Sequence, residues 1–414
     1  MFLPYRLVLL LGLALLSACQ SDPAPAPPPV TVPSGEAPNI LLIVADDLGW
    51  ADLDCYGNFL VKSPRLDELA RNGVQFMHAY AAAPTGPPSR AALLTGRRPE
   101  DLDTNAVNAR LRTLADLAHH HGHRTAHVGR WSAGTSPAEL GFDRTAALHP
   151  GPPTSYYPPY FEQPPADLLT EDKEQYLTDL VTDRALEVLR EWRADRWLMS
   201  LNFYAPHVPL EGRRDQVQFY HDLIDSTHWR RFPVPEYAAM VAVIDENVGR
   251  LVDFLRESGQ LDNTLIVFTS DNGGVDYPIA GPLGRHTPPT DNGILRGGKG
   301  SLFEGGIRVP FIVHHPGLVT DRHANLQPVS GLDVYPTVAA LFGDVPEGLP
   351  GTSLLPALRG EHLPRRELRW STAAAEAVRR GNIKRLRDLR RDSVVYFDLE
   401  AFPDESRDVL PRDF

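Results

Sequence analysis

Short apolar runs recur along much of the chain. Asn39–Val44 (NILLIV), Trp197–Phe203 and Thr264–Phe268 (TLIVF) are dominated by large apolar residues, and a fourth run closes at His127–Val128. Polar residues or a turn follow each run. Runs of this kind are typical of strands that are buried on both faces of a parallel sheet. The pattern therefore predicts four buried parallel strands.

Helical periodicity fills the segments between these runs. Ser63 and Pro64 suit the start of a helix and Gly73 suits its end, so Arg65–Asn72 is predicted to be helical. Two longer segments place their apolar residues on one helical face: Leu177, Leu180, Val181, Val188 and Leu189 in the first, and Val241, Ile244, Val248, Leu251 and Leu255 in the second. Strands that alternate with helices predict an α/β fold with a mostly parallel sheet flanked by helices.

The N-terminus carries a targeting pattern. Arg6 supplies a positive charge before the apolar stretch Leu7–Leu16, which is too short for a well-formed membrane span. The small residues before Cys19 resemble the bacterial lipobox, in which the signal is removed and the cysteine receives a lipid. We therefore expect a signal peptide at 1–18, and a lipidated Cys19 with a Pro- and Ala-rich tether over 19–38. An ordinary secretory signal cleaved near Ala18 is the alternative.

The rest of the chain divides into two predicted parts. Residues 39–360 hold the alternating strands and helices of the α/β domain. Residues 361–414 lack a long apolar run, which favours a small C-terminal α+β subdomain with antiparallel strands. This part carries a basic cluster: Arg379, Arg380, Lys384, Arg385, Arg387, Arg390 and Arg391. We interpret the cluster as a solvated face, and contact with an anionic polymer stays open.

Composition narrows the range of partners. The formal net charge is −12, which argues against nucleic acid as a general partner. Cys19 and Cys55 are the two cysteines, so lipidation of Cys19 leaves no disulfide within the folded part. A lipid anchor would place the protein in the bacterial cell envelope, on the periplasmic or outer-membrane side, with the membrane as a partner.

Polar residues with metal-ligand chemistry follow two of the predicted strands. Asp46 and Asp47 come after the first strand, and Asp271 and Asn272 come after Thr264–Phe268. Ligands of open α/β sheets bind at the carboxyl ends of parallel strands, where these side chains would meet. Carboxylates that converge in one crevice need a cation, and hard oxygen donors favour Ca²⁺, with Mg²⁺ as an alternative. Separate roles as caps or turn residues are the other interpretation.

Several motifs resemble, in chain order, those of one enzyme family. They are Ala45–Trp50 (ADDLGW), Ala82–Pro99 (AAPTGPPSRAALLTGRRP), Gly129–Gly134 (GRWSAG), Asn202–Pro209 (NFYAPHVP), Ser270–Gly273 (SDNG), Arg296–Gly300 (RGGKG), Glu304–Pro310 (EGGIRVP), Asp333–Thr337 and Tyr396–Leu399. The set resembles the formylglycine-type sulfatases (arylsulfatases) of the alkaline-phosphatase superfamily over about Asn39–Leu410. The resemblance implies a sulfatase-like α/β fold, sulfuric ester hydrolysis and a sulfated carbohydrate as substrate.

The same resemblance assigns roles to single residues. The four polar residues at the strand ends correspond to the ligands of one calcium ion. Arg90 corresponds to the arginine that orients the formylglycine. His207 and Lys299 correspond to residues that hold the sulfate.

Three positions depart from the family pattern. Gly86 stands where the family has the cysteine or serine that becomes formylglycine, so no formylglycine is expected. Arg130 replaces a lysine and keeps a positive charge that can bind sulfate. Ser132 replaces the histidine that serves sulfate elimination. Glycine would leave room for about one water molecule beside the metal.

These departures make a binding protein the expected function. We expect a degenerate sulfatase that keeps its metal and sulfate site and binds sulfated carbohydrate or related anionic esters. Two alternatives stay open. One is an active hydrolase of sulfuric or phosphoric esters that uses a metal-bound water. The other is a structural surface lipoprotein in which the site is a relic.

Overall fold

The computed structural model describes residues 37–102, 107–108, 111–227, 233–280, 286–322, 324–344 and 346–409. The predicted signal peptide, Cys19 and nearly all of the tether lie outside the described residues. The lipid anchor and the cell-envelope location therefore stay predictions.

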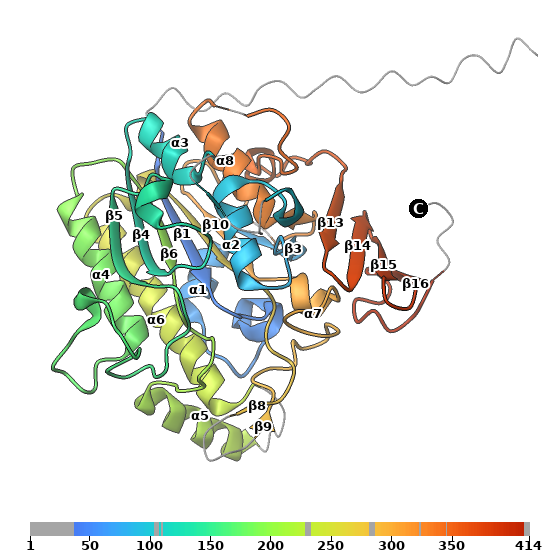
Figure 1. The fold of residues 1–414 in the computed structure, drawn as a ribbon, viewed down its shortest axis with the longest axis horizontal. Coiled ribbons are helices and arrows are strands. Elements are labelled where there is room, and N and C mark those ends of the chain that lie inside the picture. Colours follow the sequence, from blue (N-terminus) through green and yellow to red (C-terminus); the bar gives the residue numbers. More distant parts are fainter. Residues whose placement is uncertain are drawn as a thin grey trace, which may run out of the picture. The chain divides into compact units, whose positions relative to one another are not determined.

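An eight-stranded sheet forms the centre of the described chain (Figure 1). In spatial order its strands are β11 (Ala324–Asn325), β2 (Val74–Phe76), β10 (Phe311–His314), β7 (Thr264–Ser270), β1 (Asn39–Ala45), β6 (Trp197–Asn202), β4 (Arg124–Arg130) and β5 (Arg144–His149). The run from β7 to β5 is parallel, whereas β10 is antiparallel to both of its neighbours. The predicted, mostly parallel sheet and its four buried strands are confirmed.

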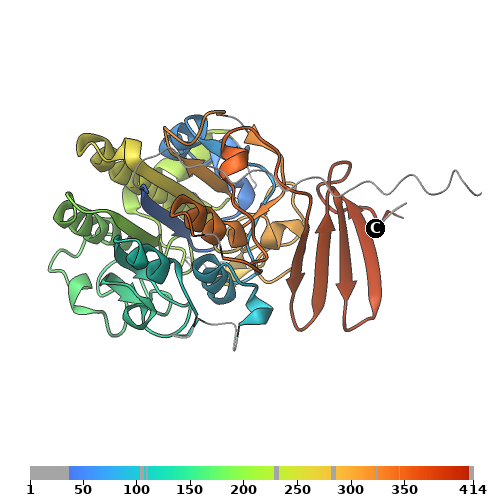
Figure 2. The same cartoon turned by 90° about the horizontal axis from the view of Figure 1, so that it is seen from above.

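Helices cover both faces of this sheet (Figures 1 and 2). One face carries α1 (Pro64–Arg71), α4 (Leu177–Glu191) and α6 (Pro235–Glu257), with α5 (Arg214–Thr227) packed on α6. The other carries α2 (Gly86–Thr95), α3 (Leu114–His120) and α8 (Val334–Leu341). Leu41 and Ile43 of β1 join the apolar cluster formed with α4 and α6. Every residue of β1 is buried, which explains why this strand is apolar from Ile40 to its end.

A second sheet, antiparallel and four-stranded, lies near the C-terminus (Figure 2). It follows α9 (Leu355–Leu358), and its strands are β13 (Glu367–Ser371), β14 (Ala375–Arg380), β15 (Ile383–Asp388) and β16 (Ser393–Asp398). Its apolar face packs against Tyr80, Leu302 and Ile307 of the α/β domain. The expected antiparallel subdomain is confirmed, and its described residues form strands and turns.

The remaining elements are short. β3 (Ala79–Tyr80) pairs with β12 (Val329–Ser330), and β8 (Ile279–Ala280) pairs with β9 (His286–Thr287). The β8–β9 pair and the short helix α7 (Glu304–Ile307) lie in the long segment between β7 and β10.

The start of α1 depends on a distant residue. Ser63 suits an N-cap, but its hydroxyl makes no capping bond and donates instead to Asp67 at 3.0 Å. The first amides of α1 donate to Asp245 of α6, from Leu66 at 2.7 Å and from Arg65 at 3.2 Å. Burial raises the pKa of Asp245 to about 7. A cap supplied from another helix is invisible to local sequence rules.

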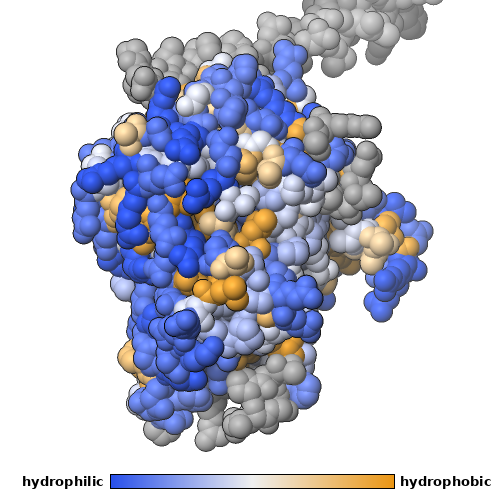
Figure 3. Space-filling view, turned by 60° about the vertical axis from the view of Figure 1, so that its left-hand side comes forward, coloured by the Kyte–Doolittle hydropathy of each residue, from blue (hydrophilic) through white to orange (hydrophobic). Residues whose placement is uncertain are grey.

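The molecular surface is mainly hydrophilic on the face shown in Figure 3, where hydrophobic residues form small groups. Within the described ranges, we find no helix with both the length and the apolar character that crossing a membrane requires.

Candidate active site

The strand pairing brings the predicted metal ligands together. Ala45, the last residue of β1, lies opposite Ser270, the last residue of β7, so the polar residues that follow are neighbours. The amide of Asp47 donates to Asp271 Oδ1 at 3.0 Å, and Asn272 Nδ2 donates to Asp47 Oδ1 at 2.8 Å. All of these side chains, and that of Asp46, are buried. The arrangement predicted from the two strand ends is therefore present.

Asp47 has a special backbone conformation. Its φ of +68° lies in the left-handed region, which aspartate tolerates better than most residues. This turn directs the Asp47 amide toward Asp271 and leaves its carboxylate facing Lys299.

Permanent positive charges lie against the carboxylates. Arg90 of α2 places Nη2 3.0 Å from Asp46 Oδ2 and 2.6 Å from Asp271 Oδ2. Arg130, the last residue of β4, also pairs with Asp46. Arginine and carboxylate groups at these distances compensate each other's charge, which offsets the cost of burying them.

Lys299 completes this set of cations. Its ammonium lies 2.7 Å from each carboxylate oxygen of Asp47. The Lys299 side chain is 20% exposed, whereas that of Arg90 is 2% exposed. Lys299 is therefore the more accessible of the two to a ligand from solvent.

Gly86 lies in the middle of the cluster, at the first residue of α2. A Cβ atom at this position would lie 2.4 Å from Asp271 Oδ2 and 2.9 Å from Arg90 Nη1. A side chain at position 86 would therefore point at the Asp271 carboxylate and the Arg90 guanidinium, inside the site where the nucleophile position is expected. The expectation that glycine leaves room for a water molecule is wrong for this arrangement, because Asp271 and Arg90 already fill the space.

Ser132 stands where the family has the histidine of sulfate elimination, and its side chain contacts Arg90. Its hydroxyl accepts a hydrogen bond from Arg90 Nη1 at 2.7 Å. Ser132 thus helps to fix the guanidinium between Asp46 and Asp271. The sequence carries no local signal for this contact, since 42 residues separate Ser132 from Arg90.

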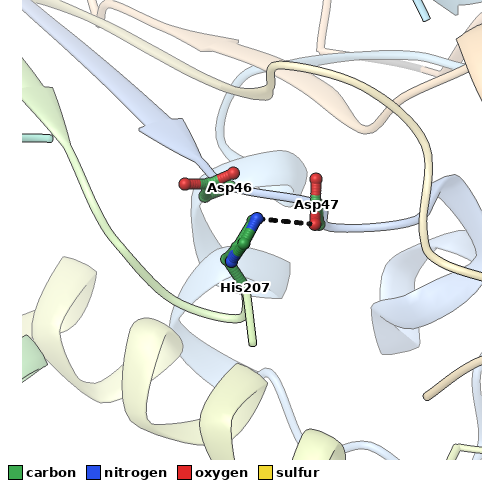
Figure 4. A group of neighbouring side chains, drawn as sticks. All are labelled: Asp46, Asp47 and His207. Atoms are coloured by element: carbon green, nitrogen blue, oxygen red, sulfur yellow. Dashed lines mark ion pairs between the residues drawn. The ribbon is translucent and has the colours of Figure 1, made fainter. Parts of the chain in front are cut away.

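His207 points toward Asp47 from the loop after β6 (Figure 4). Its Nδ1 lies 2.9 Å from the Val208 carbonyl, which can only accept, so Nδ1 carries the hydrogen. Its Nε2 lies 3.6 Å from Asp47 Oδ2. The pKa of His207 is lowered from its ordinary value, mainly because the ring is buried. The Asp47 carboxylate opposes this shift, whereas the positive charges of Arg130 and Lys299 add to it. The neutral ring therefore presents a lone pair to a carboxylate, an arrangement that a cation or proton between them would stabilise.

The oxygen-rich cluster fits a divalent cation. Ligand atoms of Asp46, Asp47 and His207 lie within 4.8 Å of one another. Asn272 Oδ1 is buried and accepts no hydrogen bond from any described residue, although buried polar atoms usually have a partner. Asp271 Oδ2 accepts none either, apart from its ion pair with Arg90. His207 was predicted only as a sulfate ligand, and its place beside Asp46 and Asp47 is a feature that the family motifs did not predict.

Comparison with known proteins identifies the family. The family model described as Sulfatase matches residues 38–344. The chain belongs to the sulfatase family. Steryl-sulfatase of Mus musculus is 30% identical over 444 residues, which cover 82% of this chain and 67% of that protein. N-acetylgalactosamine-6-sulfatase of Homo sapiens is 31% identical over 366 residues, which cover 78% of this chain and 66% of that protein. The chain thus spans about two thirds of the length of these relatives.

Solved structures share the fold. The structure of Ps i-CgsB in complex with k-i-k-neocarrahexaose has a TM-score of 0.77 and 31% identity, covering 90% of this chain and 88% of that one. The structure of BT4656 in complex with its substrate D-glucosamine-2-N,6-O-disulfate has a TM-score of 0.68 and 21% identity, covering 91% of this chain and 94% of that one. The sulfatase-type α/β fold predicted from the motifs is confirmed.

Membership of the sulfatase family indicates which chemistry to expect at this site. Sulfatases hydrolyse sulfuric esters and usually bind a divalent metal, and the cluster around Asp46, Asp47 and His207 is suited to such a cation. The roles predicted for Arg90, Arg130, Lys299 and the other site residues stay predictions.

Proposed function

We propose that this sulfatase-family protein binds sulfated carbohydrate or related anionic esters and has lost the formylglycine nucleophile. Position 86 carries the proposal. Its Cβ vector points at Asp271 and Arg90 in the centre of the site, and the residue there is glycine. Glycine has no side-chain atom that can attack sulfur, and the family's nucleophile is a side chain.

The remaining side chains are suited to hold an anion. Arg130 and Lys299 are positively charged, and His207 lies beside them. Charge-assisted hydrogen bonds from such groups are the strongest available to a sulfate oxygen. The neocarrahexaose and glucosamine disulfate bound to the two solved structures support a sulfated carbohydrate as the ligand class.

A calcium ion is the cofactor that this proposal includes, with magnesium as the alternative of the same oxygen chemistry. Asp46, Asp47, Asp271 and Asn272 would hold it. When bound, the ion supplies positive charge for a sulfate oxygen. The side chains themselves would orient the anion: the Lys299 ammonium is partly exposed beside Asp47, and Ser132 fixes Arg90.

The cellular context of the proposal rests on the N-terminal sequence. Cys19 would be lipidated and would anchor the protein in the bacterial cell envelope, where it meets carbohydrate rather than nucleic acid. Radiolabelled fatty acid incorporation in wild type, and its loss in Cys19→Ala, would test the anchor.

One experiment separates the three candidate functions. The full-length protein is incubated with an aryl sulfate and a panel of sulfated sugars in calcium, beside an Asp271→Ala control. We expect no sulfate release, together with sugar binding that weakens in the control. Release that disappears in Asp271→Ala would refute the proposal in favour of a metal-bound water. Neither release nor binding would indicate a relic site.

The packing of the site favours binding over the water mechanism. That mechanism would place a water molecule beside position 86, where an added Cβ would lie 2.4 Å from Asp271 Oδ2 and 2.9 Å from Arg90 Nη1, and this close packing supports the binding proposal. Binding needs no nucleophile, only the positive charges of Arg130 and Lys299, of which Lys299 is the more exposed.

A further inference from the structure

A buried charged cluster lies outside the active site, where the C-terminal sheet meets the α/β domain. Lys384 Nζ of β15 lies 2.9 Å from Glu304 Oε1 of α7 and 2.8 Å from Glu405 Oε1. All three residues are completely buried. The interpretation of the C-terminal basic cluster as a solvated face is therefore wrong for Lys384 and for Arg379, because both point into this junction.

Each member of the cluster has a charged or hydrogen-bonded partner, as buried charges require. Glu304 also accepts a hydrogen bond from the Tyr80 hydroxyl at 2.7 Å, and Glu405 Oε2 accepts one from the Glu304 amide at 2.7 Å. Although burial raises the pKa of Glu304, Lys384 and two nearby arginines lower it to about 2. Burial raises the pKa of Glu405 by more than Lys384 lowers it.

Glu405 adopts a costly conformation to reach this cluster. Its φ of +50° lies in the left-handed region, which glutamate seldom adopts. Strained residues persist where the surrounding contacts determine them strongly, and they are common where a site must be held in one geometry. Glu405 therefore marks a junction that fixes one arrangement of the segments it joins.

One of these segments carries Lys299. Glu304 begins α7 five residues after Lys299. Arg296, three residues before Lys299, donates from Nη1 to the Glu405 carbonyl at 3.1 Å. The Gly305 amide donates to the Arg296 carbonyl at 2.8 Å. Glu405 thus contacts both ends of the loop that presents Lys299.

The loop itself is tightly packed between its ends. A Cβ atom on Gly305 would lie 1.9 Å from the Gly297 carbonyl oxygen, so the two halves of the loop are in direct contact. The Lys299 amide donates to Gly274 at 2.9 Å, and the Gly300 amide donates to Pro84 at 2.8 Å. A shift of α7 would therefore move the Lys299 ammonium relative to Asp47.

We propose that the buried cluster of Lys384, Glu304 and Glu405 positions Lys299, so that the C-terminal sheet sets the geometry of the anion site. These are positioning residues, because they act through the loop and do not touch a ligand. The inference rests on the proposed function for its effect on anion binding. Its effect on the loop can be measured without any ligand.

The test compares two variants of the full-length protein. Lys384→Met keeps the side-chain length and leaves Glu304 and Glu405 without their cation. The control, Arg366→Met, breaks the ion pair between the partly exposed Arg366 and the buried Asp333, which also joins the C-terminal part to the α/β domain but does not touch the Lys299 loop. Glu405→Gln, which can still accept from the Glu304 amide, is a milder variant should Lys384→Met fail to fold.

Hydrogen exchange of residues 296–305 is the first readout. We expect faster exchange of these amides in Lys384→Met, or in Glu405→Gln, and wild-type exchange in Arg366→Met. Equal exchange in wild type and both cluster variants would overturn the inference. So would equal acceleration in the cluster variants and the control, which would show general destabilisation.

Affinity for an aryl sulfate, measured by calorimetry, is the second readout. We expect Lys384→Met to weaken binding about tenfold, the loss typical of one misplaced charged hydrogen bond. In a Lys299→Met background, the same substitution should have no further effect, because the cluster acts through Lys299. A further loss of affinity on adding Lys384→Met to Lys299→Met would contradict an effect that acts through Lys299. Failure of the wild type to bind would refute the proposed function, while the exchange result would still decide the inference.

Discussion

Replacing Gly86 by alanine adds one methyl group to a closely packed buried site. The new Cβ would lie 2.4 Å from Asp271 Oδ2, about 1 Å closer than an ordinary van der Waals contact. Asp271 is completely buried and held by Arg90 at 2.6 Å, so the carboxylate cannot turn away without weakening this ion pair. Overpacking of this kind costs about 1–3 kcal/mol. We expect the free energy of unfolding to fall by that amount.

Two features make the prediction easy to test: the helix propensity of alanine has the opposite sign, and the chain offers a control glycine. Gly86 is the first residue of a helix, where alanine by itself would stabilise the protein by up to about 1 kcal/mol relative to glycine. Gly317 provides the matched control, since it is exposed and an added Cβ there meets no atom closer than 3.4 Å. Urea unfolding of wild type, Gly86→Ala and Gly317→Ala gives the three free energies. If Gly86→Ala is as stable as Gly317→Ala, the packing of Asp271 and Arg90 against position 86 is refuted.

Two further predictions concern buried carboxylates. Because burial raises the pKa of Asp245 from 3.8 to about 7, the folded protein holds a proton there that the unfolded chain releases between these pH values. Stability should therefore fall by up to about 1.4 kcal/mol per pH unit as the pH rises through this window. Asp245→Asn, which can still accept from the Leu66 amide, should lack that slope in urea titrations, and an unchanged slope would contradict the assignment. Arg90→Met leaves Asp46 and Asp271 short of a cation and should cost about 3–5 kcal/mol. Added Ca²⁺ should restore more stability to this variant than to wild type, because it binds the folded state; an equal shift in both proteins would argue against the cation site.

The buried strands and the polar residues at their ends could be predicted from the sequence alone. Ile40–Val44 and Leu265–Phe268 are apolar throughout because both of their faces are buried, and that pattern identifies parallel strands without any structure. Once the strands are parallel neighbours, Asp46 and Asp271 must lie side by side at their carboxyl ends. The loss of the nucleophile was equally visible, because Gly86 is a single residue in a motif whose spacing is otherwise intact.

Only the tertiary structure decided what surrounds these residues. The contact of Ser132 with Arg90 and the burial of Lys384 join segments far apart in the chain, and their directions depend on packing. The space at Gly86 depends on where Asp271 and Arg90 point, so a missing side chain did not mean an open cavity. Residue identity and periodicity determined which groups this protein has and which strand ends they follow. Packing between distant segments decided which of those groups touch, because contact energies of that kind leave no periodic trace in the sequence.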